Sequence, residues 1–189
     1  MPNWCFNAVK VSHEDPNMIQ RMIDAADKTD SGILQEFVPC PAELRETLAG
    51  SFGDADKQAE LKAKQEENFL KFGAKDWYDW CINNWGTKWD LREVRVDCHD
   101  ANNITLSFDT AWSPPIEAYG TLEELGFIIE AYYYEPGMCF CGLYEDGCEN
   151  TINIRETTYE WASKNIPRAI DEMFGISDEY AQWEAEKQE

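Results

Sequence analysis

The sequence lacks the short motifs by which most catalytic and cofactor-binding sites are recognised. It contains no GxGxxG fingerprint, phosphate-binding loop, HExxH zinc motif, GxSxG elbow or EF-hand loop. It has only two histidines, and none of its seven cysteines form a CxxC pair. These absences disfavour a zinc knuckle, a thioredoxin-like redox pair and an enzyme, so we expect no catalytic residue, no metal site and no cofactor.

Features that would direct the chain to a membrane or out of the cell are also missing. No apolar run approaches the ~20 residues of a membrane-spanning helix. The opening Met1-Pro2-Asn3-Trp4 lacks the basic and apolar regions of a signal peptide. An odd number of cysteines without such a signal is typical of reduced thiols, so we expect a cytoplasmic protein with no membrane partner.

Basic residues are scarce. The 189-residue chain has 16 Lys and Arg against 37 Asp and Glu, a formal net charge of −21. A surface this acidic repels phosphate backbones, which disfavours direct binding to nucleic acid. Apolar residues still make up 43% of the chain and aromatic residues 13%. This composition is sufficient for a packed core and argues against disorder.

Hydrophobic periodicity predicts one α+β domain, with helices on one side of a mostly antiparallel sheet. Alternating apolar and polar residues indicate two strands over 93–98 and 103–109, which are typical of a sheet with one covered face. Apolar residues at helical spacing predict helices that include 16–26 and 116–125. Further strands are expected over residues 4–11, 33–38, 127–134, 138–144 and 150–155.

A helical segment interrupts the predicted sheet. Asp54 and Gly73 bracket a polar helix, and the aromatic-rich residues 75–89 form another helix that ends near Gly86. We therefore expect an α+β domain over 1–155 with a helical insertion at 42–90. Residues 156–189 are expected to form a C-terminal helical extension packed on that domain.

Several stretches resemble a family of small proteins carried by bacteriophages and conjugative plasmids, the YubB-like or Api-type family. The resemblance covers roughly residues 1–155 and implies a ferredoxin-like β-α-β-β-α-β core and a mobile-element origin, but no activity. It is carried by Met1-Pro2-Asn3-Trp4-Cys5, Pro39-Cys40-Pro41, Trp77-Tyr78-Asp79-Trp80, the block from Asn84 to Asp90, and Trp112-Ser113-Pro114-Pro115.

The tryptophan-rich block has two interpretations. In the first, Trp85 or Trp89 stacks on a planar ligand, Lys88 holds an anionic group and Thr87 donates a hydrogen bond. In the second, the indoles fill the core and Lys88 pairs with Asp90.

The charge distribution suggests a different site. No Lys or Arg occurs from Val96 to Ile154, whereas eleven carboxylates do. They could ensure solubility, or they could form an acidic surface that binds a basic partner and imitates the phosphates of DNA. The eleven are Asp97, Asp100, Asp109, Glu117, Glu123, Glu124, Glu130, Glu135, Glu145, Asp146 and Glu149.

Two functions follow from these patterns. The first is a non-enzymatic accessory protein of a phage or plasmid that binds and inhibits a host protein with a basic surface, as in counter-defence. The second is a protein that sequesters a nucleotide-like signal in the tryptophan block, with residues 54–73 as a lid.

Overall fold

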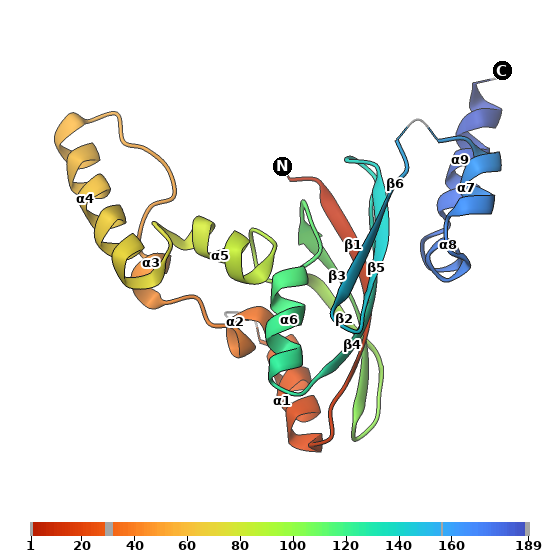
Figure 1. Ribbon diagram of the computed structural model, residues 1–189, viewed down its shortest axis with the longest axis horizontal. Helices are drawn as coiled ribbons and strands as arrows, with labels where there is room; N and C mark the ends of the chain where they lie inside the picture. Colours follow the sequence, from red (N-terminus) through yellow and green to blue (C-terminus); the bar gives the residue numbers. More distant parts are fainter. Residues whose placement is uncertain (1, 29–31, 156, 188–189) are drawn as a thin grey trace.

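A computed structural model describes residues 2–28, 32–155 and 157–187. One antiparallel sheet runs through the molecule in the strand order β2-β3-β1-β4-β5-β6 (Figure 1). Its strands are β1 (Trp4–Ser12), β2 (Arg92–His99), β3 (Asn103–Ala111), β4 (Ile128–Glu135), β5 (Phe140–Glu145) and β6 (Cys148–Asn153).

The order of elements along the chain gives the expected β-α-β-β-α-β core as β1-α1-β2-β3-α6-β4, and β5 and β6 extend the sheet beyond β4. The α+β class is therefore confirmed. The helices are α1 (Pro16–Ala26), α2 (Ile33–Phe37), α3 (Ala42–Arg45), α4 (Ala55–Phe72), α5 (Trp77–Trp85), α6 (Ile116–Glu124), α7 (Tyr159–Asn165), α8 (Arg168–Phe174) and α9 (Ile176–Glu186).

The two faces of the sheet are covered by different helices. On one face, the alternating side chains Val9 and Leu106 pack with Ile19 of α1 and Leu122 of α6, all nearly inaccessible to solvent. Burial of such apolar surface is the main stabilising contribution to the fold. On the opposite face, α7, α8 and α9 lie over the β4–β6 end, where a second apolar cluster includes Cys141 (Figure 1).

Residues 33–37 form helix α2 and not the predicted strand. Ile33, Leu34 and Phe37 are buried at helical spacing. The carboxylate of Asp90 accepts the backbone N–H groups of Leu34 at 3.0 Å and Gln35 at 2.8 Å. It thereby satisfies donors that the first turn of a helix leaves free. The strand prediction is wrong because this cap comes from a residue distant in sequence.

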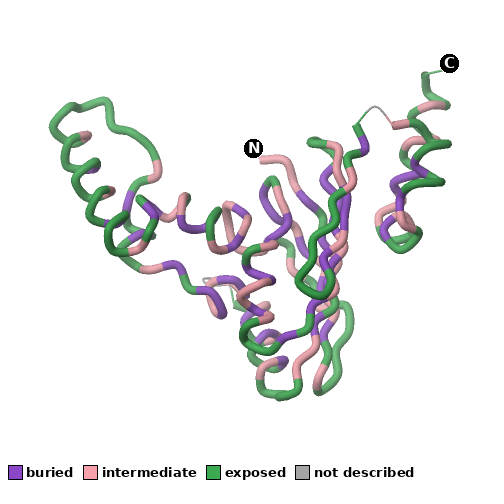
Figure 2. Tube along the Cα trace, in the orientation of Figure 1, coloured by how far each residue is buried: buried purple, intermediate pink, exposed green. Residues whose placement is uncertain are grey.

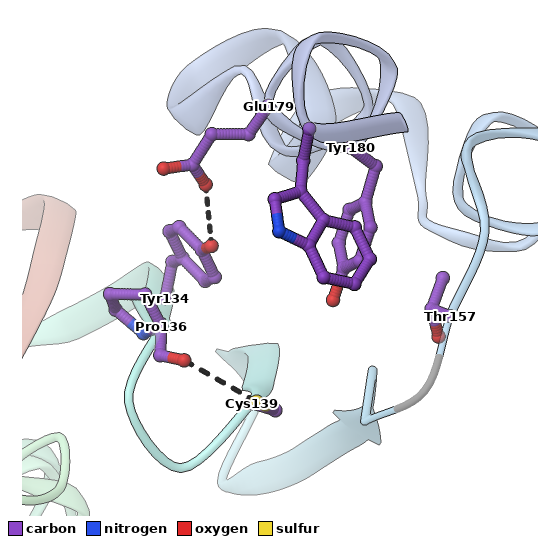
Figure 3. Close-up of a pocket in the computed structure, with 7 residues that line it drawn as sticks. Tyr134, Pro136, Cys139, Thr157, Glu179 and Tyr180 are labelled. Carbon is purple, nitrogen blue, oxygen red and sulfur yellow. Dashed lines mark hydrogen bonds between the residues drawn. The ribbon is translucent and has the colours of Figure 1, made fainter. Parts of the chain in front are cut away.

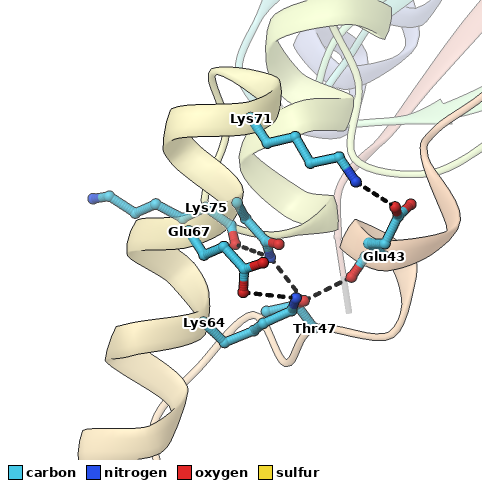
Figure 4. Close-up of polar contacts among 7 residues, drawn as sticks. Glu43, Thr47, Lys64, Glu67, Lys71 and Lys75 are labelled. Carbon is cyan, nitrogen blue, oxygen red and sulfur yellow. Dashed lines mark hydrogen bonds and ion pairs between the residues drawn. The ribbon is translucent and has the colours of Figure 1, made fainter.

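The predicted polar helix is α4, which projects away from the sheet and is largely exposed (Figure 2). Its base is held by polar contacts to the segment around α3 (Figure 4). Asn68 is buried and donates to Thr47 Oγ1 at 2.9 Å and to the Lys75 carbonyl at 3.0 Å. Lys71 pairs with Glu43 at 2.7 Å. The buried amide fixes the position of α4, since a misplaced helix would leave it unpaired.

Candidate functional site

Three of the eleven carboxylates are buried or lie beside a cation, so the prediction that they form part of the acidic surface is wrong. Glu135 is fully buried and accepts the backbone N–H of Met138. Glu130 forms an ion pair with Lys10 at 3.3 Å across β1 and β4. Asp109 lies opposite Arg92 in the pairing of β2 with β3. Of these three, Glu130 is thus paired with a cation distant in sequence, Asp109 has Arg92 opposite it on the next strand, and Glu135 is removed from the surface by burial.

Two further carboxylates lie at the other end of the strand order. Asp97 is in β2, and Asp100 follows it in the β2–β3 turn, where Asp100 Oδ1 accepts the N–H groups of Asn102 and Asn103. The side-chain amide of Asn103, which also donates to this carboxylate, and then these backbone bonds lower the pKa of Asp100. Both residues are separated from β5 and β6 by the intervening strands.

Within β5, Glu145 points to the face of the sheet opposite Tyr144 and its pairing partner Glu149. A smaller set of carboxylates nevertheless lies at the β6 end of the sheet, spread over both faces. We call this set the acidic edge: Glu117 and Glu123 of α6, Glu145 and Asp146 at the β5–β6 turn, and Glu149 of β6. None of these five forms an ion pair with a Lys or Arg in the described ranges. Glu124, also on α6, is exposed nearby in sequence.

Tyrosines connect the acidic edge to the core. Tyr144 donates its hydroxyl to Glu123 at 2.8 Å, and Tyr133 donates to Glu149 at 2.9 Å. Glu123 also reaches the β5–β6 turn, because a Cβ placed on Gly147 would lie 3.5 Å from its Oε2. Charge-assisted hydrogen bonds of this kind hold carboxylates in fixed positions. These bonds therefore fix the positions of two of the five carboxylates, Glu123 and Glu149.

The same contacts predict how stability responds to alkali. Burial, and then the bonds to Glu149 and Glu123, raise the pKa of Tyr133 and of Tyr144 well above the usual range. In the unfolded chain these tyrosines ionise with a pKa of about 10, whereas in the folded protein they ionise only at higher pH. Their contribution to stability is therefore complete below about pH 10 and decreases as the pH rises above it, because only the unfolded chain releases these protons there. Urea midpoints measured from pH 8 to 11 should fall above pH 10.

The double variant Tyr133→Phe/Tyr144→Phe is the control for this prediction. Its urea midpoint should fall less steeply over the same interval. Phenolate absorbance of the wild type near pH 10, without any loss of stability, would contradict the expected behaviour.

Most of the tryptophan-rich block is structural. Trp85 is buried, donates its Nε1–H to the Val38 carbonyl at 2.8 Å and contacts Trp80 edge to face, with ring centroids 5.8 Å apart. Thr87 is fully buried and donates its hydroxyl to the Ala111 carbonyl at 3.0 Å. The Thr87 hydroxyl therefore connects the tryptophan-rich block to β3 and is already used within the protein.

Lys88 and Trp89 have a different environment. The Lys88 ammonium lies 4.6 Å from the ring centroid of Trp89 and 5.7 Å from that of Tyr78. Within the described ranges Lys88 forms no ion pair, and Asp90 instead binds the N-terminus of α2. The pairing of Lys88 with Asp90 is therefore not formed.

A cleft of about 320 Å³ opens beside these residues. We call it the Trp cleft, and define it by Arg45, Trp77, Trp85, Lys88 and Trp89. Its size is at the lower end of the range for small-molecule pockets. No residue of α4 lines it, so the structure does not place residues 54–73 as its lid.

Two cysteines complete the wall of the Trp cleft. The thiol of Cys81 hydrogen-bonds to Cys40, and this bond, together with the nearby charge of Arg45, lowers the pKa of the Cys40 thiol. The pKa of Cys81 is raised by the same bond and by burial. The Arg45 guanidinium therefore lies close enough to influence groups inside the cleft.

Another cleft, of about 400 Å³, lies between β4 and α9 (Figure 3). Its polar groups are used within the protein. Tyr134 donates to Glu179 at 2.7 Å, Cys139 contacts the Pro136 carbonyl at 3.4 Å, and Tyr180 donates to the Ile154 carbonyl at 2.7 Å. The bonds of Glu179 and Tyr180 attach α9 to the sheet and to the segment after β6, which is a structural role.

Arg45 is the residue of the Trp cleft that sequence reasoning missed. It ends the short helix α3 and approaches Lys88 from another part of the fold. The nearby Pro39-Cys40-Pro41 stretch is a local signal for this region, but no spacing rule connects Arg45 to Lys88. Among the described residues, no group of three His, Cys, Asp or Glu side chains could hold a metal ion. None of the described helices has the length and apolar character needed to cross a bilayer.

The β-α-β-β-α-β order and the antiparallel sheet define a ferredoxin-like α+β protein. Residues 84–178, just over half of the chain, match the family described as the ferredoxin-like domain in Api92-like protein. The chain belongs to this family, which confirms the Api-type family expected from the sequence.

One solved structure is similar to most of the chain. It is the crystal structure of a protein api92 from Yersinia pseudotuberculosis, 12% identical, with a TM-score of 0.42. The alignment covers 81% of this chain and 98% of that one. A search of curated proteins gives no match.

Proposed function

We propose that this chain is a non-enzymatic accessory protein of a phage or conjugative plasmid, related to the YubB-like group, that acts in the host cytoplasm. It binds a host protein with a basic surface and inhibits it, as a counter-defence protein would. The observation that carries this proposal is the acidic edge, whose five carboxylates have no ion-pair partner within the described ranges.

The position of the acidic edge supports a protein partner. β6 is the last strand of the sheet, and its residues are exposed except for the half-buried Ile152. An edge strand presents backbone N–H and C=O groups that an added strand can pair with. A basic extended segment would therefore find hydrogen bonds along β6 and complementary charge beside it.

Charge steering supports an inhibitory role at a nucleic-acid site. The net charge of −21 attracts basic surfaces and repels nucleic acid. Carboxylates fixed by Tyr133 and Tyr144 imitate part of a phosphate array. The partner surface that fits best is one that ordinarily binds DNA or RNA.

The test is capture of host proteins by the purified chain, followed by titration of the captured protein with wild type and variants. In the variant Glu117→Gln/Glu123→Gln/Glu149→Gln, the amides keep an oxygen as acceptor for the tyrosine hydroxyls but remove three charges. We expect binding at about 50 mM NaCl, its loss at about 0.5 M because exposed charges are screened, and at least tenfold weaker binding by the variant.

A matched control removes three exposed charges elsewhere, in Glu60→Gln/Asp178→Asn/Glu186→Gln. It should bind within about threefold of wild type, since distant charges contribute only a screened term. Salt-independent binding, or equal binding by the edge variant, would refute the proposal. DNA that competes with the chain for the captured protein would support mimicry.

A further inference from the structure

The Trp cleft carries positive charge on a protein that is otherwise strongly acidic. Arg45 and Lys88 both line it, and neither forms an ion pair with a carboxylate in the part of the chain that the structure describes. Two cationic side chains thus line one cleft of a chain that has 37 acidic side chains and only 16 basic ones.

The carboxylate within the Trp cleft is already engaged. Asp90 Oδ1 accepts the N–H groups of Leu34 and Leu91, and Oδ2 accepts that of Gln35. The Asp90 carboxylate is therefore directed toward backbone donors of α2 and of Leu91, the residue before β2. Arg45 and Lys88 remain available to an incoming anion.

The tryptophans that line the cleft differ in their exposure to solvent. Trp85 is buried and fixed by its bond to the Val38 carbonyl. Trp77 and Trp89 are half-buried, so part of each ring faces the opening. Lys88 is held over Trp89 by a cation–π contact, which limits the freedom it would lose on binding a ligand. A ligand with a planar group and an attached anion could therefore place its planar group against an indole and its anion against the cations.

We propose that the Trp cleft binds a nucleoside phosphate, with the base against the half-buried indole of Trp77 and the phosphate bound by Lys88 and Arg45. Trp77 is the ring available to the base, because Lys88 lies over Trp89 and Trp4 packs on that ring with centroids 6.2 Å apart. Arginine binds phosphate through two parallel N–H donors, whereas lysine supplies a compact charge. This site is separate from the acidic edge and does not depend on the proposed function. The thiols of Cys40 and Cys81 would contact the ligand as part of the wall.

The test uses isothermal titration with adenosine 5′-monophosphate and guanosine 5′-monophosphate, together with quenching of tryptophan fluorescence. Adenosine and inorganic phosphate, each alone, show whether ring and phosphate are both required. We expect at least one nucleotide to bind and quench, and each isolated half to bind at least tenfold more weakly. The variants Lys88→Gln and Arg45→Gln should each weaken binding about tenfold or more, because each removes a charge-assisted contact.

Two further variants make the result specific. Lys88→Arg keeps the cation and should bind within about threefold of wild type. Arg95→Gln removes an exposed charge from β2, outside the cleft, and should leave binding unchanged. Circular dichroism establishes that each variant is folded.

The outcomes separate this site from the acidic edge. The triple variant of the acidic edge should bind nucleotide normally, and the Lys88 and Arg45 variants should capture the host protein normally. The proposal is overturned if neither nucleotide binds at millimolar concentration, or if Lys88→Gln and Arg45→Gln bind as wild type does. Equal binding of phosphate alone would overturn the role of the indoles.

Discussion

Replacing Gly142 with alanine is expected to destabilise the fold by about 3 kcal/mol or more. Gly142 is buried in β5 opposite Tyr133, whose ring packs over it and whose hydroxyl reaches Glu149. A Cβ at this position would overlap that hydroxyl and would lie 2.5 Å from the backbone oxygen of Asn150 in β6. Backbone cannot yield as a flexible side chain does, so the β5–β6 pairing must shift.

The matched control is Gly120→Ala in α6. A Cβ there meets nothing within 4 Å, and alanine favours helix over glycine by about 0.5–1 kcal/mol. Urea unfolding should therefore show opposite shifts for the two glycine substitutions. A Gly142→Ala protein as stable as wild type would mean that β6 does not pack against β5 as described.

Replacing Asp90 with alanine is expected to cost about 3 kcal/mol. The carboxylate accepts three backbone N–H groups, those of Leu34, Gln35 and Leu91, with N···O distances of 2.8–3.0 Å. Desolvation raises the pKa of Asp90, and these bonds oppose that shift. Without the carboxylate the N-terminus of α2 has unpaired donors, and burial of such donors is unfavourable.

Three comparisons make the Asp90 prediction specific. Asp100→Ala removes a similar acceptor from an exposed turn, where water replaces it, and should cost no more than about 1 kcal/mol. Asp90→Asn keeps one acceptor oxygen and should be intermediate. Gly32→Ala should resemble Asp90→Ala, because its Cβ would lie 2.5 Å from Asp90 Oδ1. Thermal and urea unfolding measure all four, and equal costs for Asp90→Ala and Asp100→Ala would contradict the capping role.

Features with local signals were predictable from the sequence. Asp54 accepts the N–H of Lys57 at one end of α4, and Gly73 ends it with a φ of +73°. Gly86 ends α5 in the same conformation, with a φ of +78°. The alternation over Asn103–Ala111 gives β3 with one buried face. In each case, residues within one element determine its type and its end.

Features that depend on distant residues were not predictable in this way. The short apolar run Ile33–Phe37 suits a strand or a helix equally, and the Asp90 cap that favours the helix lies far along the chain. Arg45 and Lys88 likewise line one cleft only because α3 and the segment after α5 lie side by side in the fold. A spacing rule cannot supply this information, because tertiary packing creates these contacts.

The acidic surface shows the same limit for charge. Composition gives the number of carboxylates, but which of them face a cation depends on strand pairing. Lys10 reaches Glu130 only because β1 pairs with β4, and Arg92 lies opposite Asp109 only because β2 pairs with β3. The strand pairing therefore leaves a smaller acidic surface than the composition alone predicts.

The open edge at β6 has a consequence for the behaviour of identical copies. Unprotected edge strands promote polymerisation of sheets, and natural proteins commonly prevent it with charge. Two copies that met along β6 would bring Glu149 and the carboxylates of the turn into like-charge repulsion. The same carboxylates that would recruit a basic partner would thus keep the chain from assembling with itself, and only a ligand of opposite charge would have access to that edge.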